Sequence, residues 1–226
     1  EIREQYGDER RTEIVPVDMD FSMEDMIAEE EVVLTITHQG YIKRTALNTY
    51  RTQRRGGRGV QGAMSKEEDF VEHLFIANTH NYMLFFTDQG KCYWLKVYDI
   101  PQGGRAARGR AIVNLIGCDP GEKIEAFVSV KEFDDNHYIA MATRNGIVKK
   151  TVLSAYGKPR KGGIYAIEIR DGDKLIEARV TNGEHDILLG TSEGKSIRFS
   201  ENDIRASGRK TMGVKGIALS SKEDYV

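Results

Sequence analysis

A four-residue motif, Thr-x-x-Gly, occurs four times at nearly even spacing and constrains the fold more than any other feature of the sequence. The copies end at Gly40, Gly90, Gly146 and Gly194, which lie 50, 56 and 48 residues apart. Each copy follows an apolar, strand-like run. Glycine allows the positive φ that a tight hairpin turn requires, and Asn145-Gly146 is the strongest such signal. The sequence therefore predicts four β-hairpins in a repeating unit.

Strand-like runs around the hairpins complete each repeat. The first strands of the hairpins are expected at residues 32–36, 82–86, 138–142 and 187–189. Further apolar runs predict strands at 70–77, 124–130 and 175–181 before the later hairpins, and at 112–116 and 164–169 after the basic loops. About four strands in a repeat of this length are typical of a β-propeller blade. Because no segment has the period of a long amphipathic helix, we expect an all-β, propeller-like fold of about four blades.

Charge is unevenly distributed along the chain. The formal net charge is only −2, yet residues 1–31 hold 12 acids and 3 bases, which leaves 23 acids and 30 bases in residues 32–226. We interpret residues 1–31 as an acidic linker and residues 32–226 as the folded, basic domain. A less favoured alternative is that the acidic segment folds back over the basic surface and competes with its ligand.

Lysine and arginine gather in loops that recur in phase with the hairpins. Four windows, residues 43–58, 103–110, 144–163 and 204–216, hold 19 of the 33 basic residues and no acid. Equivalent loops of a repeat protein lie along the same edge, so these charges are expected to form a continuous basic belt. The candidate contacts are Lys43, Arg44, Arg51, Arg54, Arg55, Arg58, Arg105, Arg108, Arg110, Lys149, Lys150, Lys158, Arg160, Lys161, Arg205, Arg209, Lys210 and Lys215.

The most arginine-rich and glycine-rich of these loops is Gln53-Arg54-Arg55-Gly56-Gly57-Arg58-Gly59. The guanidinium group offers a planar fork of donors that matches phosphate oxygens, and glycine lets the backbone approach a ligand closely. The pattern therefore favours a polyanion as the ligand. Residues 57–62 also match the G-x-G-x-x-G pattern of dinucleotide-binding folds, but no strand–turn–helix context surrounds them, so that interpretation is rejected.

Recurring tyrosines favour packing over base stacking. Tyr50, Tyr98 and Tyr156 follow their hairpin glycines by 8 or 10 residues, and the fourth repeat has Ile204 at the same place. An aliphatic side chain that replaces tyrosine indicates an anchor beneath the loop, so we expect these residues to be buried.

The sequence contains no arrangement that indicates catalysis. Cys92 and Cys118 have neither metal-ligand spacing nor the density of a disulfide scaffold, and the five histidines are scattered. We therefore expect no catalytic residue, metal or cofactor in this chain, and a reduced, cytosolic compartment. No apolar run approaches the length of a membrane span, and no membrane partner is expected.

The sequence resembles a known family. Residues 53–59 resemble the seven-residue box of the C-terminal DNA-wrapping domain of the A subunit of bacterial DNA gyrase. Residues 33–44 and 68–74 match its flanks, and residues 107–115 and 146–151 match later blades of that domain. The resemblance implies a β-pinwheel, a propeller variant whose blades exchange strands, with double-stranded DNA bent around its basic rim. It also implies that Gln53, Arg54, Arg55, Gly56, Gly57, Arg58 and Gly59 help to lock the wrap.

The same resemblance implies a place within a larger enzyme. The expected partners are the gyrase B subunit, together with the rest of the gyrase A subunit, in the bacterial cytoplasm at the nucleoid. The active-site tyrosine and the ATPase of gyrase belong to regions that this chain lacks, so we expect it to bind and bend DNA without cutting DNA or hydrolysing ATP. Gyrase members of the family usually have six blades, whereas four are counted here, which leaves the extent of the bend open.

Three alternatives stay open. The first is the C-terminal domain of topoisomerase IV, which captures a DNA segment; an intact box makes it less favoured. The second is a propeller-like module that binds an acidic protein through the basic loops. The third is an enzyme with a nucleotide site in the glycine-rich loop, which would require saturable binding of a mononucleotide.

Overall fold

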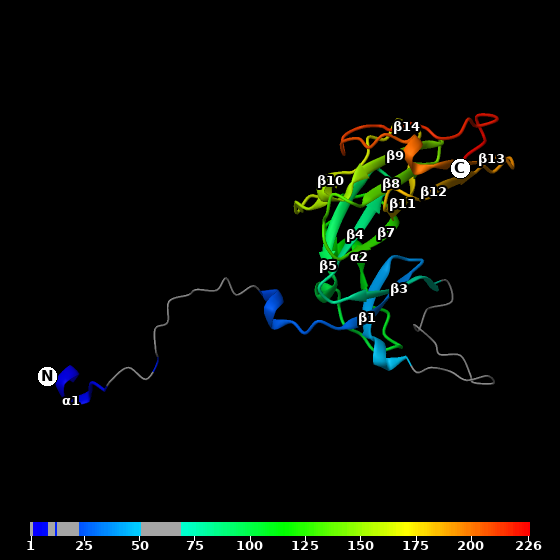
Figure 1. Ribbon diagram of the computed structural model, residues 1–226. Coiled ribbons are helices and arrows are strands. Elements are labelled where there is room, and N and C mark those ends of the chain that lie inside the picture. The colour runs from blue at the N-terminus through cyan, green and yellow to red at the C-terminus, as the bar shows by residue number, and fades with distance from the viewer. Residues whose placement is uncertain (1, 9–11, 13–22, 51–68) are drawn as a thin grey trace.

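A computed structural model describes residues 2–8, 12, 23–50 and 69–226, and its elements are labelled in Figure 1. Antiparallel strands dominate, in three four-stranded sheets and one two-stranded sheet. The strands are β1 Glu31–Thr37, β2 Tyr41–Ala46, β3 Val71–Asn78, β4 Tyr82–Thr87, β5 Lys91–Lys96, β6 Arg110–Ala111, β7 Ile124–Val130, β8 Tyr138–Thr143, β9 Ile147–Val152, β10 Ile164–Tyr165, β11 Leu175–Thr181, β12 Asp186–Gly190, β13 Ser196–Ser200 and β14 Val214–Lys215.

The described helices are short. They are α1 Ile2–Tyr6 and α2 Ile112–Ile116, with 3-10 turns η1 Met23–Met26, η2 Leu47–Thr49, η3 Val97–Asp99, η4 Leu153–Tyr156 and η5 Glu201–Asp203. None of the helices in the described ranges is long and apolar enough to cross a membrane. The all-β prediction is confirmed.

Thr-x-x-Gly forms the turn of all four hairpins. The four glycines have φ between 77° and 84°, a region that side-chain-bearing residues rarely adopt. Threonine is the other fixed residue of the motif, and its side chain helps to close the turn. In the first three turns its hydroxyl accepts a hydrogen bond, at 3.2 Å, from the backbone N–H four residues later, at Tyr41, Lys91 and Ile147. Each motif thus closes its own turn, which is why it was readable from the sequence.

Each complete sheet combines three strands of one repeat with a short strand from the next. The sheet orders are β3-β1-β2-β6, β10-β5-β4-β7 and β11-β8-β9-β14. The donated strands β6, β10 and β14 each come from the segment that follows the next hairpin along the chain. The expectation of blades that exchange strands is therefore confirmed.

A glycine stands immediately before each donated strand, at Gly109, Gly163 and Gly213, with φ of 91°, 69° and 91°. A Cβ at Gly109 would lie 2.4 Å from the carbonyl oxygen of Ile42, and one at Gly213 would lie 2.4 Å from that of Val148. No side chain fits at that distance. Glycine at these places allows the donated strand to reach the neighbouring blade.

The hydrophobic core lies between successive sheets. One cluster, which includes Leu34 and Phe85, joins the first and second sheets, and another, which includes Phe86 and Ile139, joins the second and third sheets. Tyr156 and Ile204 are buried, as expected of packing anchors, while Tyr50 and Tyr98 are half-buried. Stacked sheets that share side chains in this way give the propeller-like arrangement.

Two predicted strands need correction. Residues 112–116 form helix α2, because Ile112 and Ile116 lie one helical turn apart and both point into the core, and Gly117 ends the helix with φ of 63°. The strand expected at 164–169 is limited to Ile164–Tyr165. Its ladder stops there because the next two N–H groups, of Ala166 and Ile167, donate to the carbonyl of Gly90 instead.

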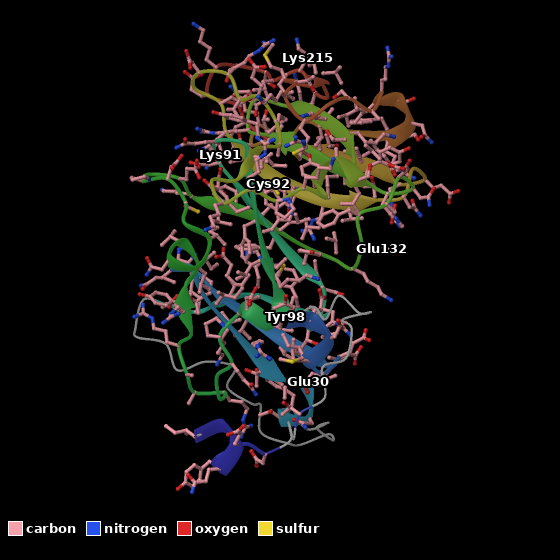
Figure 2. The ribbon with its side chains drawn as sticks, turned by 90° about the vertical axis from the view of Figure 1, so that its left-hand side faces the viewer. Glu30, Lys91, Cys92, Tyr98, Glu132 and Lys215 are labelled. Carbon is pink, nitrogen blue, oxygen red and sulfur yellow. The ribbon has the colours of Figure 1, made fainter. Side chains whose placement is uncertain are left out.

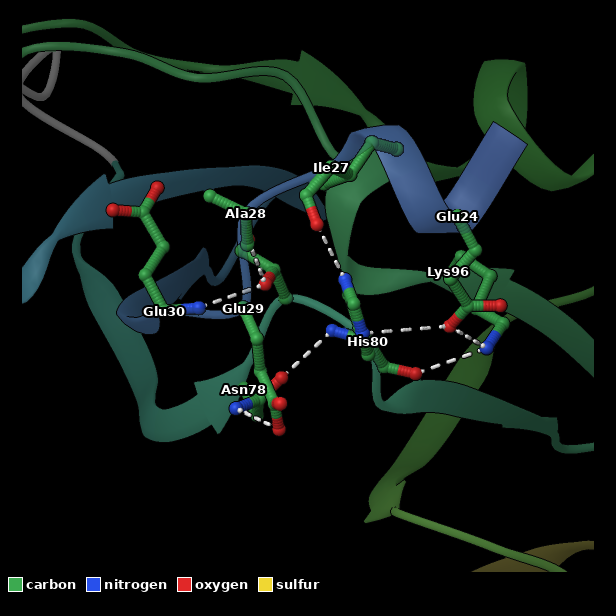
Figure 3. Close-up of polar contacts among 9 residues, drawn as sticks. Glu24, Ile27, Ala28, Glu29, Glu30, Asn78, His80 and Lys96 are labelled. Carbon is green, nitrogen blue, oxygen red and sulfur yellow. Dashed lines mark hydrogen bonds and ion pairs between the residues drawn. The ribbon is translucent and has the colours of Figure 1, made fainter. Parts of the chain in front are cut away.

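The last residues of the acidic segment are bound to the connection between β3 and β4 and to the end of β5 (Figure 3). The hydroxyl of Thr79 donates to the carbonyl of Ala28 at 2.8 Å and accepts from the N–H of Glu30 at 3.1 Å. His80 Nε2 donates to the carbonyl of Ile27 at 2.8 Å, and Lys96 Nζ lies 2.6 Å from a carboxylate oxygen of Glu24. Residues 24–30 therefore belong structurally to the folded domain.

The fourth blade differs from the other three. Its hairpin, β12 with β13, forms a two-stranded sheet to which no further strand of the described chain is added. Leu188 on β12 and Ile197 on β13 are exposed, at 71% and 39%. The equivalent hairpins of the other blades are flanked on both sides, which buries the corresponding side chains.

Candidate nucleic-acid interface

Three basic loops occupy the same position in successive blades. The chain after each loop returns to the hairpin turn of the preceding blade, where a backbone carbonyl accepts the N–H of Ile112, of Ala166 or of Gly216. These carbonyls belong to Gly40, Gly90 and Gly146, the turn glycines of the motif. Because the docking contact is the same, the three loops project from equivalent edges of their blades.

The loop before β6 presents Arg105 to solvent, and Arg110, the first residue of β6, is also exposed. Arg108 is more constrained. Its guanidinium lies 3.7 Å over the ring of Tyr41, donates to Gln39 Oε1 at 2.6 Å, and has its Nε 3.7 Å from the buried carboxylate of Asp69. Arg108 therefore holds its loop against the first hairpin and has fewer free donors than its neighbours.

The loop before β10 presents Lys158, Arg160 and Lys161, all exposed. Within the described ranges none of the three forms an ion pair. Their ammonium and guanidinium groups are thus free to meet an anionic ligand.

The loop before β14 presents Arg205 and Lys210, both exposed, while Arg209 is half-buried; Lys215, in β14 itself, is also exposed. Lys210 Nζ lies 5.8 Å from the ring centre of Tyr165, and a guanidinium nitrogen of Arg209 lies 3.5 Å from the carbonyl oxygen of Tyr165. This loop therefore touches the strand that follows the preceding basic loop. In Figure 2, Lys215 lies at the end of the molecule opposite Glu30, with Lys91 and Cys92 of the second sheet between them.

The structure corrects the prediction for three lysines. Lys43, Lys149 and Lys150 are 1%, 1% and 4% exposed. Their amines donate to backbone carbonyls of other segments, and Lys150 also lies 3.6 Å from the buried carboxylate of Glu201. Side chains committed in this way do not reach a phosphate, so we remove these three from the candidate contacts. Arg44 is half-buried, and its Nε donates to the carbonyl of Ile100.

The remaining candidates fall outside the described residues. They are Arg51 and the box, Gln53, Arg54, Arg55, Gly56, Gly57, Arg58 and Gly59. Their role stays a prediction from the sequence.

Reactive groups for chemistry are not assembled in the described part of the chain. No group of three or more His, Cys, Asp or Glu side chains there is arranged to hold a metal ion. Both cysteines are free thiols. Burial raises the pKa of the Cys92 thiol well above its ordinary value and that of Cys118 to about 11. Protonated thiols of this kind are poor nucleophiles.

Sequence reasoning missed the residues that position Arg108. Asp69, Gln39 and Tyr41 lie 39, 69 and 67 residues away from it along the chain. Gln39 and Tyr41 flank the first turn glycine, and a Tyr beside a hairpin turn is a weak signal by itself. Only the return of the loop onto the first hairpin brings these groups together.

Antiparallel four-stranded blades that borrow a strand from the next repeat, with basic loops on equivalent edges, define a strand-exchanging β-propeller domain. The sequence model of the family described as "DNA gyrase C-terminal domain, beta-propeller" matches residues 31–78, 81–131, 137–182 and 185–226, one match for each repeat. The chain belongs to this DNA gyrase C-terminal domain family.

Individual relatives agree with that assignment. The chain is 51% identical over 216 residues to the DNA gyrase A subunit of Clostridium acetobutylicum, covering 96% of this chain and 26% of the relative. It is 46% identical over 225 residues to the DNA gyrase A subunit of Salmonella typhimurium, covering 100% of this chain and 26% of the relative. The chain thus spans about a quarter of the length of these relatives.

Solved structures share the fold. The C-terminal domain of DNA topoisomerase IV superimposes with a TM-score of 0.74 and 32% identity, over 88% of this chain and 60% of that one. A DNA gyrase A C-terminal domain superimposes with a TM-score of 0.67 and 25% identity, over 87% of this chain and 63% of that one.

Proposed function

We propose that this domain binds double-stranded DNA along its basic loops and bends the duplex into a wrap, with little sequence specificity. The observation that carries the proposal is a set of exposed bases without ion-pair partners in the described ranges, placed on equivalent loops of a gyrase-family propeller: Arg105, Arg110, Lys158, Arg160, Lys161, Arg205, Lys210 and Lys215. Repeated phosphates along a duplex are the natural complement of repeated cations along a rim.

Within a complete gyrase, the wrap would present a crossed DNA segment for strand passage, so that ATP turnover produces negative supercoils. The partners in this proposal are double-stranded DNA, the gyrase B subunit and the rest of the gyrase A subunit, and the compartment is the bacterial cytoplasm. The domain itself would need no cofactor and would carry no catalytic residue. Its contribution to the reaction would be to set the path of the DNA.

Phosphate contacts and DNA deformation set the energetics. Each phosphate neutralised releases counterions, so affinity falls steeply with salt. Bending a site of 20–30 base pairs by 40–90° costs on the order of 1–6 kcal/mol, which several cationic contacts must offset together. Sequence would enter through the ease of bending rather than through base contacts.

The proposal is tested by ligating nicked circular DNA in the presence of the domain and resolving the topoisomers. We expect a linking-number shift that grows with protein concentration and disappears in high salt. Replacing the exposed Arg105 by alanine should reduce the slope of log K against log salt by about 1, since one phosphate contact is lost. Lys131, exposed but outside the basic loops, provides the control substitution. Binding without any linking shift would contradict wrapping.

A second candidate function is DNA-segment capture in the manner of a topoisomerase IV C-terminal domain, which the structural similarity to such a domain favours. The two differ in whether the duplex is wrapped. Bending of a short duplex, measured by fluorescence transfer between its ends, without a linking-number shift would favour segment capture.

A further inference from the structure

Two buried lysines occupy the same place in different blades. Lys43 on β2 and Lys149 on β9 each stand three residues after the turn glycine of their hairpin. Lys43 Nζ donates to the carbonyls of Gly104, Arg105 and Ala107 at 3.0, 2.6 and 2.8 Å. All three of its N–H bonds are therefore used on one stretch of backbone, the basic loop of the next blade.

Lys149, two blades further along, makes a related contact with the basic loop of the fourth repeat. Its Nζ donates to the carbonyl of Ala166 at 2.5 Å and to the carbonyl of Arg209, which lies in the loop before β14. Burial, together with the nearby charge of Arg209, lowers the pKa of Lys149 to about 8, and burial also lowers the pKa of Lys43. An unpaired cation in the interior is costly unless backbone dipoles surround it.

The fold does not require a cation at this position. The second blade has Tyr93 there, whose hydroxyl donates to Glu122 at 2.8 Å, and the fourth has Ile197. The presence of lysine at this position in the first and third blades is therefore explained by its contacts in those blades and not by the fold as a whole. In both blades a captured carbonyl belongs to an arginine of the basic loop, Arg105 or Arg209.

We propose that Lys43 and Lys149 are positioning residues for the DNA interface: Lys43 binds three backbone carbonyls of the next blade's basic loop and Lys149 binds one, that of Arg209, and each contact fixes the path of that loop and so the spacing of its cationic side chains. This inference rests on the proposed DNA function. At Lys43, three carbonyls of one loop turn inward onto one amine, and the Arg105 side chain is exposed. At Lys149 one carbonyl does so, that of Arg209, whose side chain is half-buried while that of the next residue, Lys210, is exposed.

A fixed loop conformation matters most when the domain wraps DNA. Ordering a loop on binding costs conformational entropy, and a loop that is already ordered avoids that cost. A short duplex meets one loop at a time and tolerates some disorder. A bent duplex must meet several loops at once, in register.

The test uses Lys43→Met and Lys149→Met, with the exposed Lys131→Met as the matched control. Hydrogen exchange without DNA is read at Gly103 and Ala107 in the first loop and at Ser207 in the last; all three N–H groups donate to backbone carbonyls. We expect Lys43→Met to speed exchange about tenfold in the first loop only, and Lys149→Met to do so in the last loop only. A general loss of stability would speed exchange in both loops. An effect of each variant on its own loop alone, the crossed exchange pattern, therefore indicates that each lysine fixes the loop that it contacts.

DNA measurements on the same variants complete the test. We expect each variant to keep its affinity for a short duplex within about threefold and to lose most of the linking-number shift on ligated circles. Lys43→Gln, which keeps two donors, should fall between Lys43→Met and the unaltered chain, and it serves if Lys43→Met does not fold. Unchanged loop exchange, or exchange raised equally in both loops, overturns the inference. An unaltered chain that binds DNA without a linking shift overturns wrapping instead, and the crossed exchange pattern then still decides whether the lysines hold the loops.

Discussion

At the scale of single residues, the availability of a lysine depends on whether other segments of the chain cover it. Lys43 on β2 and Lys149 on β9 are buried, and backbone carbonyls of other segments accept hydrogen bonds from their amines. Lys158 and Lys210 lie in loops and stay in solvent. All four are equally basic in the sequence, but only the last two remain available to a phosphate.

The lowered pKa of Lys149 predicts a pH-dependent stability. Its folded pKa of about 8 lies below the ordinary value of 10.5. Between these values the unfolded chain binds more protons than the folded chain, so the free energy of unfolding rises with pH. Relative to Lys149→Met, the unaltered chain should gain up to about 3 kcal/mol between pH 7 and 10.5.

Urea denaturation of both proteins across this pH range measures the difference. The neutral amine keeps two N–H groups for its two carbonyl partners, so the fold itself should persist at high pH. A stability difference that does not change with pH would contradict the buried, desolvated environment of Lys149.

At the scale of elements, backbone conformation controls strand exchange. Gly213 allows β14 to reach β9 because its φ of 91° and its closeness to Val148 exclude a side chain. Gly208 lies in the same loop, has no atom within 4 Å of the place of a Cβ, and has an ordinary φ. The two glycines provide a matched pair.

Gly213→Ala should lower the free energy of unfolding by about 2 kcal/mol or more, through backbone strain and the clash with the Val148 carbonyl. Gly208→Ala should change it by less than about 1 kcal/mol. Thermal unfolding followed by circular dichroism compares them. Equal effects would mean that the close approach at Gly213 is not what keeps the donated strand in place.

The contacts of residues 24–30 make a second prediction at this scale. Removal of residues 1–30 should lower the stability of the blades by a few kcal/mol more than removal of residues 1–22 does, because the buried Thr79 and the half-buried His80 lose hydrogen-bond partners. Urea unfolding of the two truncated proteins gives the difference. Equal stability of the two truncated proteins would show that residues 24–30 act only as a linker and do not stabilise the blades.

At the scale of the whole molecule, the blades form a series with two unlike ends. The first blade exposes Leu74 and Ile76 on β3, at 58% and 59%. The last exposes Leu188 and Ile197 on its hairpin. A propeller normally covers such surfaces by closing its ring or by adding a neighbour. In the proposed wrap, the bend of the DNA would therefore depend on the number of blades in the series.

The arginines of the box predict a separation of wrapping from binding. Replacing Arg54, Arg55 and Arg58 by alanine should leave affinity for a short duplex mostly intact, because in the proposed interface the other loops would supply most phosphate contacts. The linking-number shift on ligated circles should disappear, since this loop is the most arginine-rich and glycine-rich. Equal loss of both properties would show that the box is an ordinary part of the binding surface.

Much of the fold could be predicted from the sequence, and the reasons are local. Thr37 and Gly40 close a turn by themselves, and so do their counterparts in the next two repeats. Alternating apolar residues marked β7 at 124–130 and β11 at 175–181 with the bounds observed. Helix α2 was mistaken for a strand because a five-residue apolar run fits either period.

The sequence by itself determined the repeat, the hairpins, the all-β class and the family, since each depends on residues close together in the chain or on their overall pattern. Tertiary structure alone decided which basic side chains face outward. Lys43 is buried because a loop some sixty residues later returns to cover it, and Arg108 is restrained by Asp69 and Tyr41 from an earlier repeat. Burial and pairing arise when distant segments meet, and a single segment carries no record of the segment that will cover it.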